Sequence, residues 1–377
     1  MLMFGLHAVL VGGLFSRLAE VQRALGLNEA AFGLALTALP LGGFVGTMIS
    51  PGLIEALGPR RLLLAGFAVA GATPVLAGTA WDWGSLFAAL FAFGLMMALT
   101  SIGSNVEADR VALATNAPMI ARSHGSWGIG FLLASGLAAL AIRAGITPMQ
   151  QFWLMFGVAV AGAVALIGPL RESPARPYGR AGPVRPYGRA EQAGRLALPD
   201  GATWRVLSFA LCGMVLEGVT RNFSVIYLRD GFGAADWVAA LALPAFVIPQ
   251  TFGRFATDPL IARMGVVRFT RVLSVISLIG LLALVFTGSL WVALAACAVI
   301  GLGASAAIPI ATVALARGAS RPVAESVAAF ALVQSGVGLV APVIYGMVAG
   351  ALDHRYAMAL MLPLPILAWI RARQVAG

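Results

Sequence analysis

The sequence predicts an all-α membrane protein in which twelve transmembrane helices form two pseudo-symmetric six-helix bundles. The first reason is composition, because 60% of the residues are hydrophobic, only 11% are charged and the mean hydropathy is +0.92. A soluble domain of this length carries about twice that share of charged residues. The second reason is a series of apolar runs, each near the ~20 residues that cross a bilayer as a helix. The third is one long hydrophilic segment that separates these runs into two sets of six.

The apolar runs place the expected helices in order along the chain. Their approximate ranges are 2–24, 29–50, 60–80, 84–107, 120–142, 149–170, 205–228, 235–256, 267–287, 290–315, 323–350 and 356–371. The first run has no basic n-region and no clear cleavage site, so we expect a retained helix rather than a signal peptide. A native start upstream of Met1 stays open.

The hydrophilic segment 171–203 is expected to be a flexible linker between an N-terminal bundle (1–170) and a C-terminal bundle (204–377). Arginine, proline and glycine dominate it, and the hexamer Arg-Pro-Tyr-Gly-Arg-Ala occurs twice, at 176–181 and 185–190. Such a composition has too little apolar surface to form a packed core.

The basic character of the chain fits a membrane protein better than a nucleic-acid-binding protein. The net charge is +10 and the pI is near 11.0, but basic residues of membrane proteins gather in cytoplasmic loops. All 25 basic residues are arginine, which excludes a P-loop lysine and a Schiff-base lysine. We expect no enzyme activity and no cofactor, and no metal site either, because no Cys/His cluster has metal-ligand spacing.

The distribution of arginine predicts which side of the membrane each loop occupies. Twelve crossings place both termini on one side, and that side receives most of the arginines, at positions 60, 61, 110, 122, 171–205, 254, 263, 268, 271, 317, 321, 371 and 373. The other side receives those at 17, 23, 143, 229 and 355, and Arg221 falls within a range. By the positive-inside rule, the linker and both termini are cytoplasmic in a bacterial-type inner membrane.

An offset of 207 residues reveals an internal repeat. It aligns Gly26 with Gly233, Leu34 with Leu241, Gly46 with Gly253, Gly58 with Gly265, Arg61 with Arg268 and Gly94 with Gly301. One register holds over four helices, which favours a true duplication. Two parallel six-helix halves are typical of a transporter that works by alternating access, with its site at their interface.

The loop between the second and third ranges carries a family resemblance. Residues 51–61, Pro-Gly-Leu-Ile-Glu-Ala-Leu-Gly-Pro-Arg-Arg, resemble the loop G-x-L-a-D-r-x-G-r-r of the major facilitator superfamily, and residues 253–268 resemble it in the second half. The resemblance implies that the loop charges brace the cytoplasmic side of the outward-open state, through Glu55, Arg60, Arg61, Asp258, Arg263 and Arg268. The alternative is that they are ordinary positive-inside anchors.

A second resemblance covers the fourth and fifth ranges. Residues 104–110, Ser-Asn-Val-Glu-Ala-Asp-Arg, and 124–130, His-Gly-Ser-Trp-Gly-Ile-Gly, are similar to bacterial members of this superfamily grouped near the fucose permease. It implies substrate or proton roles for Asn105, His124 and Trp127, and a gating role for Asp109 and Arg110. The alternative is a polar helix end whose groups pair locally, which we favour for Glu107 and Arg110.

Charged residues inside the apolar ranges are further candidates, because a charge at the centre of a transmembrane helix costs about 2.5–3.5 kcal/mol. Glu217 and Arg221 lie four residues apart in the range 205–228 and therefore on one helix face. Either they form a structural ion pair, or Glu217 is a protonatable coupling carboxylate with Arg221 as its partner or as a substrate anchor. Asn222 lies beside them.

Three further side chains are weaker candidates. Arg17, in the outer half of the first range, could attract an anionic substrate together with Arg221, but we favour an arginine that extends outward to the membrane interface. Gln334 could bind substrate. We expect His7 to be a satisfied core histidine.

These features together predict a secondary transporter for a small solute, driven by the proton gradient. The expected partners are the solute, the proton and the lipid bilayer, with no nucleic acid, and the chain is expected to be a monomer. Uptake of a polar metabolite and export of a drug-like compound both stay open. A different class, a non-transporting sensor or assembly factor on the same scaffold, is the alternative.

Overall fold

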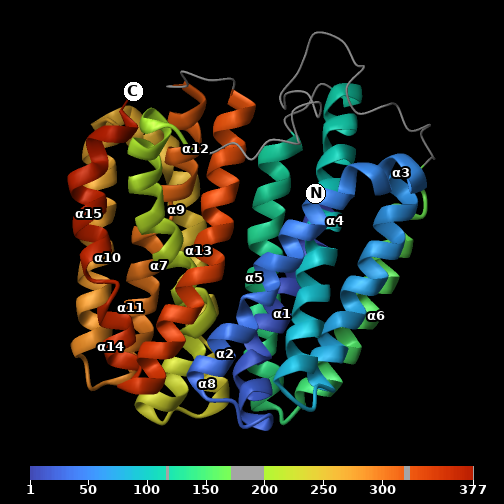
Figure 1. Cartoon of the computed structure of the whole chain (residues 1–377), viewed down its shortest axis with the longest axis horizontal. Helices are drawn as coiled ribbons and strands as arrows, with labels where there is room; N and C mark the ends of the chain where they lie inside the picture. The colour runs from blue at the N-terminus through green and yellow to red at the C-terminus, as the bar shows by residue number, and fades with distance from the viewer. Residues whose placement is uncertain (116–118, 171–198, 318–322, 377) are drawn as a thin grey trace. The chain divides into compact units, whose positions relative to one another are not determined.

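The computed structural model describes residues 1–115, 119–170, 199–317 and 323–376, and every regular element in these ranges is a helix (Figure 1). The helices of the first part are α1 (Leu2–Ala24), α2 (Glu29–Leu36), α3 (Ala38–Gly78), α4 (Trp83–Thr115), α5 (Met119–Arg143) and α6 (Pro148–Ile167). The later helices are α7 (Gly201–Phe232), α8 (Asp236–Ala240), α9 (Ala242–Met264), α10 (Val266–Phe286), α11 (Leu290–Gly303), α12 (Ala307–Arg317), α13 (Val323–Ala351), α14 (His354–Ala359), α15 (Pro363–Arg371) and the short 3₁₀ helix η2 (Ala372–Val375). Of the predicted linker 171–203, positions 171–198 lie outside the described residues.

Within the described residues, 10 helical stretches are long and apolar enough to cross a membrane. Two departures from the predicted ranges explain why this number is not twelve. Glu29–Gly78 forms one stretch, although Gly58 inside it has non-helical backbone angles and lies where the sequence predicts a loop. The last predicted range, 356–371, is divided between the short helices α14 and α15.

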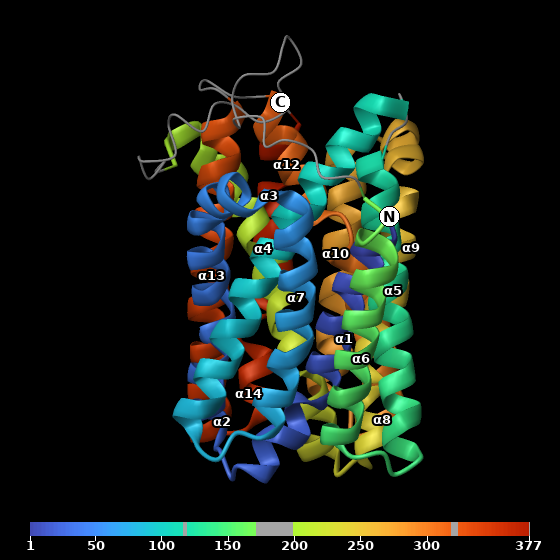
Figure 2. The ribbon, with the colours of Figure 1, turned by 90° about the vertical axis from the view of Figure 1, so that its right-hand side faces the viewer.

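Helix packing divides the described chain into two compact units. Unit 1 contains the described residues before 171 together with Ala235–Pro244, and unit 2 contains the rest. In unit 1, α3 packs along α4 and α6, while α1 packs along α5 and α6 (Figure 2). In unit 2, α7 packs against α11, α12, α13 and α15, and α10 packs along α11.

Helix α7 is the central element of unit 2, and its start differs from the prediction. The Asp200 side chain accepts a hydrogen bond from the backbone N–H of Thr203 at 2.8 Å, which caps the helix at Gly201. Aspartate is a favoured N-cap because it satisfies an N–H group that has no partner within the helix. The helix therefore begins before Arg205, the residue at which the sequence predicts its first turn.

The predicted helix 290–315 is also divided, because α11 ends at Gly303 and α12 begins at Ala307. The sequence there is Leu-Gly-Ala-Ser-Ala-Ala-Ile-Pro, and Pro309 cannot donate a hydrogen bond to the carbonyl oxygen of Ser305, four residues earlier. A break inside a transmembrane helix frees backbone carbonyl groups that need new partners. Here the carbonyl oxygen of Ser305 has such a partner in the side chain of Arg254, which is described below.

The positions that the 207-residue offset pairs have matching local geometry. Gly58 has φ 76° and ψ 154°, and Gly265 has φ 77° and ψ 153°, a positive-φ conformation that side chains other than hydrogen rarely allow. A Cβ on Gly94 would collide with the carbonyl oxygen of Leu39, and one on Gly301 would collide with that of Phe246, which is the residue 207 positions after Leu39. The turn and the helix contact are thus both repeated.

These close contacts predict that Gly94→Ala and Gly301→Ala each destabilise the protein. Overpacking of a tight contact costs about 1–3 kcal/mol, and a lower melting temperature of the purified protein in detergent would report it. Gly136→Ala is the matched control, since a Cβ there meets nothing within 4 Å. Equal melting temperatures for all three variants would contradict the packing argument.

Candidate functional site

The strongest candidate site is a cluster of three charged side chains in unit 2. Glu217 lies near the middle of α7, and its side chain is only 9% exposed. Arg221, one turn later on α7, forms an ion pair with Glu217 Oε1, as the spacing predicts. Arg254 of α9 reaches the same carboxylate, with Nη2 at 3.4 Å from Oε1 and 3.3 Å from Oε2. One buried carboxylate therefore lies between two guanidinium groups.

The helix break positions Arg254. Its Nε donates a hydrogen bond of 3.2 Å to the carbonyl oxygen of Ser305, which lies between α11 and α12. The Ser305 carbonyl has no helical donor, because the residue four positions later is Pro309, and Arg254 satisfies it. Gly253 allows this approach, because a Cβ there would lie 2.5 Å from Ser305 Oγ.

Sequence reasoning missed Arg254, which it assigned to a cytoplasmic loop. The structure places it near the middle of α9, which spans Ala242–Met264. The signal was available: Arg254 lies within the predicted range 235–256, and a buried carboxylate elsewhere requires a cationic partner. The break at Ser305 also had a signal, because Pro309 lies four residues later and has no N–H to donate to the Ser305 carbonyl oxygen.

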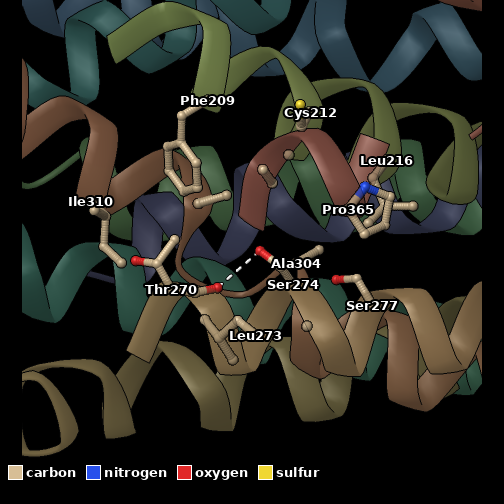
Figure 3. Close-up of a pocket in the computed structure, with 14 residues that line it drawn as sticks. Phe209, Cys212, Leu216, Thr270, Leu273, Ser274, Ser277, Ala304, Ile310 and Pro365 are labelled. Carbon is tan, nitrogen blue, oxygen red and sulfur yellow. Dashed lines mark hydrogen bonds between the residues drawn. The ribbon is translucent and has the colours of Figure 1, made fainter. Parts of the chain in front are cut away.

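A small cavity lies beside the same break. It is lined by Phe209, Cys212 and Leu216 of α7 and by hydroxyl-bearing residues of α10, among them Ser274, which donates to the carbonyl oxygen of Thr270 at 2.9 Å (Figure 3). Its volume is about 30 Å³, enough for water, which needs roughly 10–15 Å³ per molecule. It is too small for a metabolite.

Unit 2 also has a larger apolar groove of about 480 Å³ along α7, α13 and the α14–α15 segment. Its walls are largely aliphatic, with Val215, Val219, Val337, Val340, Ile344 and Leu360 among them. The hydroxyl of Tyr345, one of its few polar groups, already lies 3.1 Å from His354 Nδ1. The groove thus offers few groups to orient a polar solute, whereas the charged cluster offers several.

In unit 1, the predicted candidate Trp127 belongs to a neutral cluster. Its Nε1 donates a hydrogen bond of 3.1 Å to His7 Nδ1, and His7 Nε2 lies 3.1 Å from the carbonyl oxygen of Met97. A carbonyl only accepts, so Nε2 carries the hydrogen and Nδ1 is the acceptor, which describes a neutral imidazole. His7 is therefore a satisfied histidine, as predicted, but it is joined to a site candidate from α5.

Arg17 does not extend outward to the membrane interface, and that prediction is wrong. It is 0% exposed and makes three hydrogen bonds of 2.8 Å, to Gln151 Oε1, Glu20 Oε1 and the carbonyl oxygen of Ile146. Because its donors are taken up by α1, α6 and the turn before α6, it joins these elements instead of pointing to water. The sequence could not show the buried acceptors.

The candidates at the end of α4 pair locally. Arg110 Nη2 donates to Glu107 Oε1 at 2.6 Å, as favoured from the sequence, and Asn105 Nδ2 donates to the carbonyl oxygen of Ser101 at 2.9 Å. Asp109 is partly buried. The side chain of His124 lies outside the described residues, so its predicted role stays a prediction.

The remaining candidates are spread along the chain. Asn222 is partly buried beside Arg221, and Gln334 of α13 is exposed. Arg60 is partly buried and donates to the carbonyl oxygen of Gly168 at 2.8 Å. The other predicted loop charges are exposed, namely Glu55, Arg61, Asp258, Arg263 and Arg268.

A comparison with known protein families identifies the superfamily of the chain. The family model described as Major Facilitator Superfamily matches residues 1–344 of the chain. The chain belongs to the Major Facilitator Superfamily. This confirms the resemblance identified in the loop sequences, and it places the chain among multi-pass membrane transporters rather than enzymes.

Two relatives in this superfamily match nearly the whole chain. An uncharacterised transporter of Sinorhizobium fredii is 27% identical over 365 residues, which cover 93% of this chain and 90% of the relative. An uncharacterised transporter of Yersinia pestis is 23% identical over 353 residues, covering 92% and 88%.

Solved structures of the superfamily share the fold. The nucleoside transporter NupG, in one variant, superposes with a TM-score of 0.77 at 14% identity, covering 100% of this chain and 98% of that one. A D-xylose–proton symporter superposes with a TM-score of 0.72 at 16% identity, covering 100% and 97%. At such low identity the likeness establishes the fold and not the solute.

The buried bonds of Arg17 predict that Arg17→Met destabilises the protein strongly. Breaking a buried, hydrogen-bonded charge pair costs about 3–5 kcal/mol. Arg23→Met, on the same helix, is the control, because its side chain is 53% exposed and an exposed pair contributes about 0–1 kcal/mol. Unfolding of both variants in detergent measures the difference, and a parent-like Arg17→Met would refute the structural role.

The Trp127–His7 hydrogen bond predicts an energetic coupling between these residues. Trp127→Phe leaves Nδ1 of His7 without its donor, and His7→Leu removes the acceptor. In a double-mutant cycle the two should couple by about 0.5–1.5 kcal/mol, measured by unfolding in detergent. Strict additivity would show that the bond contributes nothing.

Proposed function

We propose that this chain is a secondary active transporter that moves a small solute across the inner membrane by alternating access, coupled to the proton. Membership in the superfamily supports transport, and one structural relative is a proton symporter. The observation that carries the coupling proposal is Glu217, a buried carboxylate near the middle of a membrane-spanning helix. In a membrane protein such a residue is a functional candidate by default.

The proposed architecture is the one predicted from the sequence. Twelve spans form bundles at 1–170 and 204–377, which rock relative to one another, and the linker and both termini are cytoplasmic. The repeated geometry at Gly58 and Gly265 supports a duplicated scaffold, and the arginine distribution supports the orientation. We propose that the protein acts as a monomer.

The proposed role of Glu217 follows from its two partners. As a carboxylate it holds Arg221 and Arg254 together, and so it ties α7 to α9. When it takes up a proton, the attraction to both guanidinium groups is lost and the two helices are released from this link. Proton uptake and helix movement are thereby coupled through a single group.

The other candidates have supporting roles in this proposal. The loop charges Glu55, Arg60, Arg61, Asp258, Arg263 and Arg268, with Asp109 and Arg110, form cytoplasmic ion pairs that break and re-form during the cycle. Asn105, Trp127, His124, Asn222 and Gln334 line the path of the solute. Arg17 supports the bundle through its buried bonds rather than by contacting solute.

Proteoliposomes that enclose the pH-sensitive dye pyranine test this proposal. Nucleosides and pentoses are the first solutes to add, because structural relatives transport molecules of these kinds. In the parent, the transported solute acidifies or alkalises the lumen in proportion to its flux. Glu217→Gln should lose this proton signal at least about tenfold, while solute exchange without a pH gradient continues.

Asp82→Asn is the matched control, since Asp82 caps α4 through Ser85 at 2.8 Å and asparagine is an equally good N-cap. Its proton signal should equal that of the parent. A Glu217→Gln variant with parental proton flux and parental pH dependence would eliminate Glu217 as the coupling residue.

A further inference from the structure

The charged cluster of unit 2 has an unbalanced charge. Glu217 contributes one negative charge, and Arg221 and Arg254 contribute two positive charges. The cluster therefore has a formal charge of +1 when Glu217 is ionised. A net charge within a membrane-spanning segment is unfavourable unless water or an ion compensates it.

Arg254 is the less firmly held of the two arginines. Its distances to the carboxylate oxygens are 3.3 and 3.4 Å, whereas charge-assisted hydrogen bonds of this kind are usually about 2.7–2.9 Å. Its side chain is 37% exposed, compared with 9% for Glu217. A charged group within a membrane-spanning helix is expected to face water rather than lipid, and on that ground we take the exposed part of Arg254 to be accessible to a solute.

We infer that the solute is a monoanion with a carboxylate, or a similar oxyanion, that binds Arg254 when Glu217 takes up a proton; this inference rests on the proposed function. The guanidinium group presents parallel N–H donors that fit a carboxylate in a bidentate manner. The bond from Nε to the carbonyl oxygen of Ser305 fixes the plane of the group. The solute replaces Glu217 as the anion that Arg254 contacts.

The charges also explain why the two ligands bind together. A proton alone would raise the cluster from +1 to +2, and an anion alone would place two carboxylates at the same arginines. The proton strengthens the attraction for an anion, and it also removes the carboxylate that competes with the anion for Arg254, so each ligand raises the affinity for the other. With both bound, the charge returns to +1, which makes the full cycle of a monoanion and one proton electroneutral.

Other charged side chains lie near α7 among the described residues. Glu217 forms its ion pairs with Arg221 on α7 and Arg254 on α9. From the elements packed on α7, α14 contributes His354, whose Nε2 lies 3.9 Å from Asp230 Oδ2 near the end of α7. Helix α15 contributes Arg371 in its last turn. The proton dependence is therefore assigned to Glu217.

Matched pairs of neutral and acidic solutes test the inference on the purified full-length chain. The probes are glucose with glucuronate, glycerol with glycerate, and benzyl alcohol with benzoate, each added at pH 6 and pH 8 in a thermal-shift titration. At least one acid should raise the melting temperature while its neutral partner does not. Its Kd should fall as the pH falls, by up to about tenfold per pH unit for one linked proton.

Variants separate the roles of the two side chains. Glu217→Gln should bind the acid at pH 8 as tightly as the parent does at pH 6, and without pH dependence. Arg254→Lys should weaken binding about tenfold or more, because it loses the bidentate geometry. Arg205→Gln, an exposed arginine of α7, should bind like the parent. An Arg254→Lys variant with parental affinity would overturn the inference even if harsher variants fail to fold.

The outcomes distinguish this inference from the proposed function. If no acid stabilises the parent, or if only neutral solutes bind and drive a proton flux that depends on Glu217, the anion class is wrong and proton-coupled transport stands. If an acid binds through Arg254 but its transport moves no protons, the anion site stands and the coupling is wrong. Transport of the acid that responds to membrane potential would overturn the electroneutral cycle.

Discussion

A charge inside an apolar helix must be paired or must face water, and this constraint determines the polar interior of the chain. Arg17 satisfies it by full burial among three acceptors. Glu217 satisfies it with two cations that are themselves partly exposed. The first arrangement uses its donors on fixed partners and so stabilises a bundle, whereas in the second Arg254 is 37% exposed and can contact a ligand. Scaffold and candidate site thus differ in whether the hydrogen-bond donors are already occupied.

The same constraint extends to the backbone. Between Gly303 and Ala307 the helix is interrupted, and the carbonyl oxygen of Ser305 accepts a hydrogen bond from Arg254 rather than from the next helical turn. A polar side chain and a break in the helix therefore stabilise one another. In unit 1, the neutral His7–Trp127 pair needs neither a charged partner nor a break in a helix, since both of the hydrogen bonds of His7 are formed between neutral groups.

The sequence was sufficient for features that depend on local composition. Apolar length predicted the helical stretches, and the loop glycine at position 58 marked a change of backbone direction that the structure contains. The i, i+4 spacing predicted the pair of Glu217 with Arg221. What it could not supply were partners from distant helices: Gln151 for Arg17, and Arg254 for Glu217. Such contacts depend on which faces meet, and uniformly apolar helices carry little pattern to indicate it.

A comparison of positions 207 residues apart separates the properties that both repeats share from those that one repeat has alone. The offset of 207 residues preserves the glycines at the helix contacts, since Gly94 and Gly301 approach equivalent carbonyl groups. The charged cluster is not preserved: the counterparts of Glu217, Arg221, Arg254 and Ser305 are Leu10, Leu14, Thr47 and Ala98. Leu10 and Leu14 are fully buried, so apolar packing replaces the ion pair in the first copy. Close helix approach is required in both copies, whereas the ion pairs around Glu217 belong to the second copy alone, because the first has leucines at the positions of Glu217 and Arg221.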